Sequence, residues 1–145
     1  MLRLALVLLA AQAASPKQII QKRYAELNRA MVGMNAPAAA SWLKRYAAKG
    51  FYYVSGAGTS YTADQLAALL QKEFNGTQSV KKSEYRFANL LVKGSKASCS
   101  VISRLVVVVS GGRRVEDDTT AIYNWTEVNG VWKVASIVTT KEEKR

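Results

Sequence analysis

The chain has 145 residues, the length of a single domain with one hydrophobic core. It carries 21 lysines and arginines against 10 aspartates and glutamates, and it contains no histidine. It therefore lacks the commonest general base and the commonest transition-metal ligand. Its one cysteine, Cys99, can form no internal disulfide and is expected to be a buried apolar residue, so neither a metal site nor a cofactor is predicted.

The first residues have the pattern of a secretory signal peptide: a basic start, a short apolar run and the small-residue triplet Ala11-Gln12-Ala13. The apolar run is far shorter than the roughly 20 residues that span a bilayer. We therefore predict a signal peptide over residues 1–14, cleaved near Ala13 or Ala14, and a single domain over residues 15–145. The predicted location is periplasmic or secreted. A signal retained as an anchor and a buried first helix are the alternatives.

Three helices are predicted before the main strands. The first covers residues 17–34, where apolar side chains recur at helical spacing, and the second covers residues 38–48. The third begins after a capping box formed by Thr62 and Gln65 and ends near residue 75.

The rest of the chain is predicted to form strands, with a short aromatic strand at residues 51–55 and a meander of four strands from residue 85 onward. The last two strands are joined by Asn129-Gly130, a dipeptide that favours a two-residue type I′ turn. This turn predicts three cross-strand pairs: Val128 with Val131, Trp125 with Val134, and Tyr123 with Ser136.

The turn between the two preceding strands decides which side chains face inward. A loop of odd length within Ser110–Arg114 places apolar residues opposite apolar residues along the whole ladder, whereas a two-residue loop does not. The odd loop predicts the pairs Val109 with Val115, Val101 with Tyr123, and Cys99 with Trp125. It points Ser103, Asp117, Thr119 and Ser136 inward, and it leaves the outer face to Ile102, Ile122 and Ile137.

The order of these elements and several short motifs are similar to those of a known superfamily. The motifs are Trp42-Leu-Lys-Arg-Tyr46, Phe51-Tyr-Tyr-Val54, Thr62-Ala-Asp-Gln-Leu66 and Trp125-Thr-Glu-Val-Asn-Gly-Val-Trp-Lys-Val134. With them the chain resembles the nuclear transport factor 2-like superfamily, which includes SnoaL-like and ketosteroid isomerase-like domains. The resemblance implies an α+β fold, a cystatin-like cone in which N-terminal helices pack on a strongly curved, mostly antiparallel sheet and enclose a pocket. It also implies a homodimer through the outer sheet face, around Ile102, Ile122 and Ile137.

The resemblance directs attention to acidic residues on the inner face, because enzymes of this superfamily typically use an inward aspartate as general base. Residues 47–50 carry no acid at the position where such domains often have one. The remaining candidate is Asp117, with Tyr123 as a hydrogen-bond donor; an Asp117 that is solvated or paired with Arg114 is the structural alternative. A core filled by aromatic side chains is the alternative to a ligand cavity. The predicted ligand pocket is lined by Trp42, Tyr46, Tyr61, Ser103, Thr119, Tyr123, Trp125 and Ser136.

Two functional hypotheses follow, and a third, an accessory or interaction protein that dimerises through the outer sheet face, is compatible with either of them. The first is an exported domain that binds a small apolar ligand or a protein partner without catalysis. The second is an isomerase, cyclase or dehydratase that uses Asp117 as general base. The basic residues are spread over every segment without a nucleic-acid-binding motif. This distribution predicts nonspecific attraction to anionic surfaces and no specific nucleic-acid partner.

Overall fold

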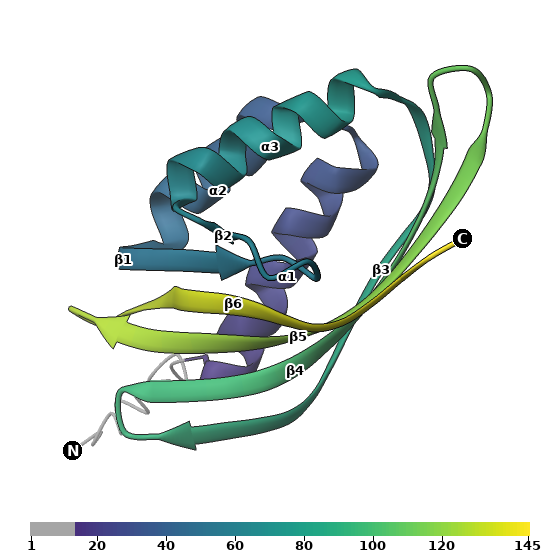
Figure 1. The fold of residues 1–145 in the computed structure, drawn as a ribbon. Coiled ribbons are helices and arrows are strands. Elements are labelled where there is room, and N and C mark those ends of the chain that lie inside the picture. The colour runs from purple at the N-terminus through teal and green to yellow at the C-terminus, as the bar shows by residue number, and fades with distance from the viewer. Residues whose placement is uncertain (1–13) are drawn as a thin grey trace, which may run out of the picture.

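The computed structural model describes residues 14–145, so the predicted signal peptide lies almost entirely outside the described residues. The described part forms three helices and six strands arranged as an α+β cone (Figure 1). In it, the longest strands bend around the helices, and all three helices lie on the concave side of the sheet. Within this part, no helix combines the length and the apolar character needed to cross a membrane.

The three helices are α1 (Pro16–Val32), α2 (Ala36–Tyr46) and α3 (Ala63–Asn75). Each begins with a side-chain cap that accepts a hydrogen bond from the backbone amide three residues later; the caps are Ser15, Asn35 and Thr62. The predicted capping box of α3 is confirmed, because Gln65 also accepts from the amide of Thr62 at 2.9 Å. Helix α2 begins and ends two residues earlier than predicted, since the extended backbone of β1 starts at Ala47.

The six strands form one sheet in the order β2-β1-β6-β5-β4-β3. Only β1 and β6 pair in parallel, which confirms the mostly antiparallel sheet. The first meander strand begins eight residues before its predicted start, directly after the cap that ends α3. The strands are β1 (Ala47–Val54), β2 (Ser60–Tyr61), β3 (Thr77–Lys93), β4 (Lys96–Val109), β5 (Arg114–Val128) and β6 (Val131–Lys144).

The loop between β4 and β5 has an odd length, as predicted, but the predicted register is wrong by two residues. Its three residues, Ser110–Gly112, are closed by a hydrogen bond from the Val109 amide to the Arg113 carbonyl at 2.9 Å. Gly111 and Gly112 both have positive φ values, 94° and 80°, which allow a tighter loop than the predicted one. The pairs formed include Val107 with Val115, Val101 with Ala121, and Cys99 with Tyr123. Because the side-chain period is two, a slip of two leaves each side chain on its predicted face.

The β5–β6 hairpin confirms the turn at Asn129-Gly130, where both φ values are positive, 51° and 77°. Val128 pairs with Val131 and Trp125 with Val134, also as predicted. Beyond Trp125 the prediction fails, because a bulge inserts Ala135 into β6 and shifts the register by one. Tyr123 consequently pairs with Ile137 instead of Ser136. Such bulges bend a strand, and here the bend lets β6 follow the curvature of the cone.

The hydrophobic core lies between the helices and the concave face of the sheet. Its largest fully buried side chain is Trp125, which is 1% exposed. Tyr24 of α1 packs edge-on against Tyr123 and Trp125, with ring centroids 5.1 and 5.8 Å away. Cys99 is buried beside them, as predicted, and lies 3.4 Å from the Tyr24 hydroxyl. This cluster fills one end of the cone.

Candidate functional site

The other end of the cone contains an inner cavity of about 170 Å³ between the helices and the concave face of the sheet. An engineered apolar cavity of about 150 Å³ holds one benzene molecule, so the inner cavity has room for a ligand of about one ring. Its wall is mainly apolar and combines side chains from all three helices with β4, β5 and β6. The apolar wall includes Leu27, Trp42, Leu66, Val101, Ala121 and Ile137.

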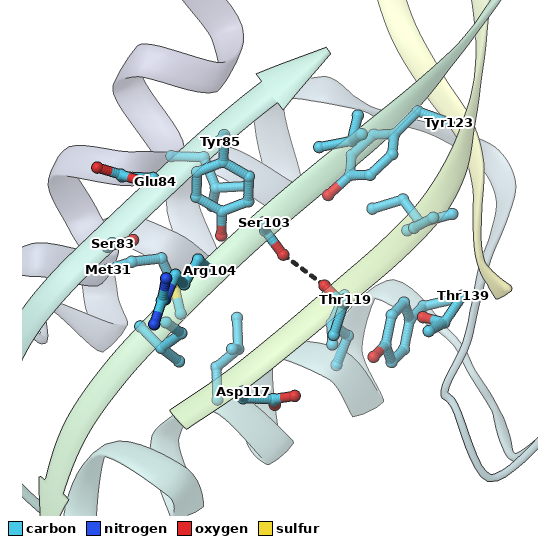
Figure 2. A pocket seen from close by; sticks show the side chains of 18 of the residues that line it. Met31, Ser83, Glu84, Tyr85, Ser103, Arg104, Asp117, Thr119, Tyr123 and Thr139 are labelled. Atoms are coloured by element: carbon cyan, nitrogen blue, oxygen red, sulfur yellow. Dashed lines mark hydrogen bonds between the residues drawn. The ribbon is translucent and has the colours of Figure 1, made fainter. Parts of the chain in front are cut away.

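Several hydroxyl groups interrupt this apolar wall, and four of them lie close together on the sheet (Figure 2). Ser103 on β4 and Thr119 on β5 pair across the sheet, and their side-chain oxygens are hydrogen-bonded to each other. Figure 2 shows the phenol hydroxyls of Tyr85 and Tyr123 pointing toward this pair. Neither phenol makes a hydrogen bond to another residue within the described part of the chain. Hydroxyls without a partner in a largely enclosed space favour a ligand that supplies the missing hydrogen bonds.

Both phenols stay protonated. Burial raises the pKa of Tyr123 well above its usual value, with further rises from Tyr85 and Tyr53. Burial also raises the pKa of Tyr85 to about 12. The two side chains are therefore neutral near neutral pH and able to donate as well as accept hydrogen bonds.

Asp117 lies on the same face of β5, two residues from Thr119, and its carboxylate reaches the inner cavity (Figure 2). The atom Oδ1 is buried and has no hydrogen-bond partner among the described residues. Burial raises the pKa of Asp117 to about 6, and the nearby charge of Glu142 adds to the rise while Lys144 opposes it. The alternative of an ion pair with Arg114 is wrong, because Arg114 binds Glu116 instead, at 3.0 Å.

Two further acids stand beside Asp117. Glu73, near the end of α3, also lines the inner cavity; burial raises its pKa, Lys144 lowers it and Glu142 raises it. Glu142 on β6 pairs across the sheet with Thr119, which places it near Asp117, and Gly56 in the loop after β1 packs against it. A Cβ atom on Gly56 would lie 2.8 Å from the Cβ of Glu142, so only glycine permits this approach. Among residues 14–145, no group of three or more potential ligands has a geometry suited to a metal ion.

The carboxylates mark the point where the inner cavity opens. A second hollow of about 470 Å³, here called the outer groove, runs from this point along the ends of α3, β4 and β5. The outer groove and the inner cavity share four lining residues: Met31, Glu73, Leu105 and Asp117. A ligand that enters through the outer groove therefore passes Asp117 and Glu73, which line both hollows.

The structure brings together five of the predicted site residues at the inner cavity: Trp42, Ser103, Asp117, Thr119 and Tyr123. The other four predicted site residues are absent from its lining. Trp125 is enclosed in the core, and Tyr61 packs on Tyr53 with ring centroids 5.9 Å apart. Tyr46 packs against Trp42 one turn away on α2, with ring centroids 5.6 Å apart, but it does not reach the lining of the inner cavity, and the Arg23 guanidinium lies 3.8 Å from its ring centroid.

Ser136 is the last of the four predicted site residues that are absent from the lining. The bulge at Ala135 reverses the predicted orientations of Ser136 and Ile137. Ser136 was predicted to face the pocket, but its hydroxyl accepts a hydrogen bond from Asn124 at 3.0 Å, away from the inner cavity. Ile137 was predicted on the outer face, but it is 5% exposed and lines the inner cavity. Ile102 and Ile122 do lie on the outer face, 43% and 40% exposed.

The prediction omitted two residues that the structure places at the site, Tyr85 and Glu73. Tyr85 carried a signal, because it occurs in an aromatic segment at the start of the predicted meander. Glu73 follows Leu70 by three residues and Leu66 by seven, which places it on the same helical face as these apolar side chains. An acid on the apolar face of a helix indicates a polar site, and this spacing could have identified Glu73.

Comparison with known proteins places this cone in a recognised fold. No family model and no curated protein matches the sequence. Among solved structures, an NTF2-like protein of unknown function from Prochlorococcus marinus matches with a TM-score of 0.70 and 14% identity, over 90% of this chain and 95% of that one. A domain of unknown function with a cystatin-like fold from Nostoc punctiforme matches with a TM-score of 0.67 and 16% identity, over 86% and 75%.

A type 2 hexachlorocyclohexane dehydrochlorinase, LinA, has a TM-score of 0.69 and 12% identity, over 89% of this chain and 88% of the enzyme. At such low identities these likenesses establish the fold and nothing finer. The chain has the nuclear transport factor 2-like fold, which confirms the resemblance seen in its motifs. Enzymes and proteins of unknown function share this fold, so the function has to be argued from the site.

Proposed function

We propose that this protein is an exported domain that binds a small, mostly apolar molecule in the inner cavity without transforming it. The observation that carries the proposal is the apolar cavity of about 170 Å³ with two tyrosine hydroxyls that lack a partner among the described residues. Small-molecule sites typically combine an apolar wall with a few convergent polar groups.

Export is supported by the signal-like pattern of the first residues and by the position of the predicted cleavage site, directly before the cap of α1. Helix α1 begins at Pro16, and its cap Ser15 bonds to Gln18 through both side chain and backbone. Cleavage near Ala13 or Ala14 would leave this cap intact. The intact mass of the protein from an exported fraction tests the proposal, since a mass that includes the first 13 residues would overturn cleavage.

Ligand binding is tested with 4-ethylphenol, a neutral single-ring probe, by isothermal titration calorimetry. The wild type is expected to bind it, and Ala121→Leu is expected to abolish binding, because the added side chain fills the inner cavity. The matched control is Ala39→Leu, which enlarges a fully buried alanine in α2 away from the cavity lining. Equal binding by wild type and Ala121→Leu would show that the probe binds elsewhere.

The two enlargements also test the cavity itself without a ligand. Overpacking a filled core costs about 1–3 kcal/mol, which is the expected loss in the free energy of unfolding for Ala39→Leu. The loss for Ala121→Leu should be much smaller, since leucine enters empty space. Equal losses for the two variants would show that the cavity is not open to a side chain.

A second candidate function is proton transfer by Asp117, as in an isomerase, cyclase or dehydratase. The observation that favours it is a carboxylate at the inner cavity whose pKa is raised to about 6, close to the value that suits a general base. One protein with this fold is named a dehydrochlorinase, which shows that the fold is compatible with catalysis.

This candidate is tested by deuterium exchange into 1-phenylpropan-2-one, a ketone of one-ring size. A base takes a proton from the carbon beside the carbonyl, and a deuteron from D₂O then replaces it. Catalysis by Asp117 predicts faster exchange with the wild type than with Asp117→Asn or with buffer alone, whereas equal rates in all three would favour binding without catalysis.

A further inference from the structure

The charges at the entrance of the inner cavity point to a finer description of the ligand. We propose that the ligand is an amine, whose apolar body occupies the inner cavity and whose ammonium group lies between Asp117 and Glu73. This inference rests on the proposed binding function and adds the chemical class of the ligand.

The first argument is the balance of charge at the entrance. Three carboxylates, those of Asp117, Glu73 and Glu142, meet one ammonium group, that of Lys144. Lys144 is engaged with Glu142 at 3.3 Å, so among the described residues neither Asp117 nor Glu73 has a cation of its own. This excess of negative charge occurs in a chain with a formal net charge of +11, which makes it a local feature of the site.

Other charged side chains near the outer groove do not remove this excess. Arg145 is held by Asp118 at 2.7 Å, on the opposite face of β5. Arg113 also lines the outer groove, but it precedes Asp117 by four residues of extended chain, a separation of roughly 13 Å. A ligand cation between Asp117 and Glu73 would relieve the repulsion between the two carboxylates.

The second argument is independent of the acids. Tyr123 is only 7% exposed, and its hydroxyl points into the inner cavity without a partner among the described residues (Figure 2). Together with Tyr85 and the Ser103–Thr119 pair, it forms a hydroxyl cluster deeper in the cone than Asp117. Thr119 and Asp117 are two residues apart on one strand, which separates the hydroxyl cluster from the carboxylates by roughly 7 Å. The site therefore suits a molecule with an ammonium at one end and a hydrogen-bonding group at the other.

A series of three matched probes tests the inference: tyramine, 4-ethylphenol and 3-(4-hydroxyphenyl)propionate. They share a phenol ring and differ in carrying a cation, no charge or an anion at the other end. We expect tyramine to bind at least about tenfold more tightly than 4-ethylphenol near neutral pH, because its ammonium forms charge-assisted hydrogen bonds. The anionic probe should bind most weakly of the three, since Asp117 and Glu73 repel it.

Substitutions at the entrance test whether Asp117 and Glu73 cause the preference for tyramine over 4-ethylphenol. Asp117→Asn and Glu73→Gln are each expected to reduce the preference for tyramine over 4-ethylphenol, measured as the ratio of the two affinities, by about tenfold. The matched control is Asp118→Asn, which removes the same charge from the opposite face of β5 and should keep the preference. Glu73 as a whole residue is exposed, and only its carboxylate is partly desolvated at the cavity, so its variant keeps the test valid if Asp117→Asn fails to fold.

The outcomes separate the inference from the function on which it rests. Equal affinities for tyramine and 4-ethylphenol would overturn the proposal that the ligand is an amine, but not the proposal that the inner cavity binds a small molecule. If the anionic probe bound most tightly of the three, the amine proposal would likewise be overturned and the binding proposal would stand. No binding of any probe would overturn both proposals.

Discussion

Ser103 and Thr119 face each other across β4 and β5, and their side-chain oxygens share a hydrogen bond on the concave face of the sheet. Two apolar side chains at these positions would make the inner cavity a plain hydrophobic space. The hydroxyl pair instead adds a polar group to the wall of the inner cavity, and along β5 this group lies between Asp117 and Tyr123. The pair therefore divides the apolar wall into two parts and gives a bound ligand an orientation.

Thr119→Val should weaken both the fold and ligand binding. Valine keeps the shape of threonine, but it leaves the partly buried Ser103 hydroxyl without its partner, which costs about 1 kcal/mol in the free energy of unfolding. The affinity for 4-ethylphenol should fall several-fold. Urea denaturation and calorimetry measure the two effects.

The control for this change is Thr120→Val, one residue along β5 and on the other face of the sheet. Its effect on stability should stay within about 0.5 kcal/mol, as expected for a substitution that breaks no bond. If the two valine variants behave alike, the Ser103–Thr119 bond has no role in stability or binding.

Asp117→Asn should stabilise the protein above pH 6. The pKa of Asp117 is raised from 3.8 to about 6, so between these values the folded state binds the proton more strongly than the unfolded state does. The stability that this carboxyl contributes is therefore complete below pH 3.8 and is lost as the pH rises to about 6. The gain in the variant is about 1 kcal/mol, after allowance for solvent screening of a half-buried group.

Urea denaturation at a series of pH values measures this gain, and Asp118→Asn is the matched control. Asp118 binds Arg145 at 2.7 Å on the outer face, so its loss should destabilise the protein slightly, opposite in sign to the effect at Asp117. A pH profile for Asp117→Asn that runs parallel to that of the wild type would contradict the raised pKa.

Glu142→Gln should lower the pKa of Asp117. Burial is the larger cause of the raised value, and the negative charge of Glu142 is the next. Glutamine keeps the size of the side chain and removes the charge, and Lys144, released from its ion pair, is then free to favour the ionised form of Asp117. A carboxyl titration followed by NMR measures the shift.

Glu143→Gln provides the comparison for this titration. Glu143 is the next residue on β6, pairs with Lys141 at 3.1 Å and is absent from the residues that act on Asp117. An Asp117 titration that moves equally in both variants would show a general effect of net charge in place of a local one.

The sequence was sufficient to predict the fold and most of the concave face, for reasons that individual residues show. The alternation along β4 and β5 determined which side chains face inward, so Ser103, Asp117 and Thr119 were placed correctly even though the register was wrong by two. The turn at Asn129-Gly130 was predictable because positive φ is needed at both positions, a requirement that few dipeptides satisfy.

The parts that could not be predicted depend on contacts between distant segments. The bulge at Ala135 arises because β6 must bend around the helices, and no local pattern in the sequence specifies that bend. It moved Ile137 into the inner cavity and Ser136 out of it. In the same way, the raised pKa of Asp117 depends on Glu142 and on burial, which only the assembled sheet brings about.

The outer face of the sheet carries the remaining prediction, a homodimer. Ile102 and Ile122 are exposed near the middle of this face, on neighbouring strands. The charged side chains beside them are already paired, Arg104 with Glu116 at 3.2 Å and Arg145 with Asp118 at 2.7 Å. We propose that two copies pack these faces together about a twofold axis. The interface then buries both copies of Ile102 and both copies of Ile122.

Ile122→Lys should therefore dissociate the dimer, because a twofold interface would bury two copies of the lysine without a partner. The dissociation constant, measured by analytical ultracentrifugation, should rise at least tenfold. Val128→Lys is the control, since Val128 is similarly exposed but lies at the end of the β5–β6 hairpin. Because the inner cavity opens on the concave side, both variants should keep the affinity for 4-ethylphenol. A wild-type protein that sediments as a monomer at every concentration would overturn the dimer and leave the binding proposal intact.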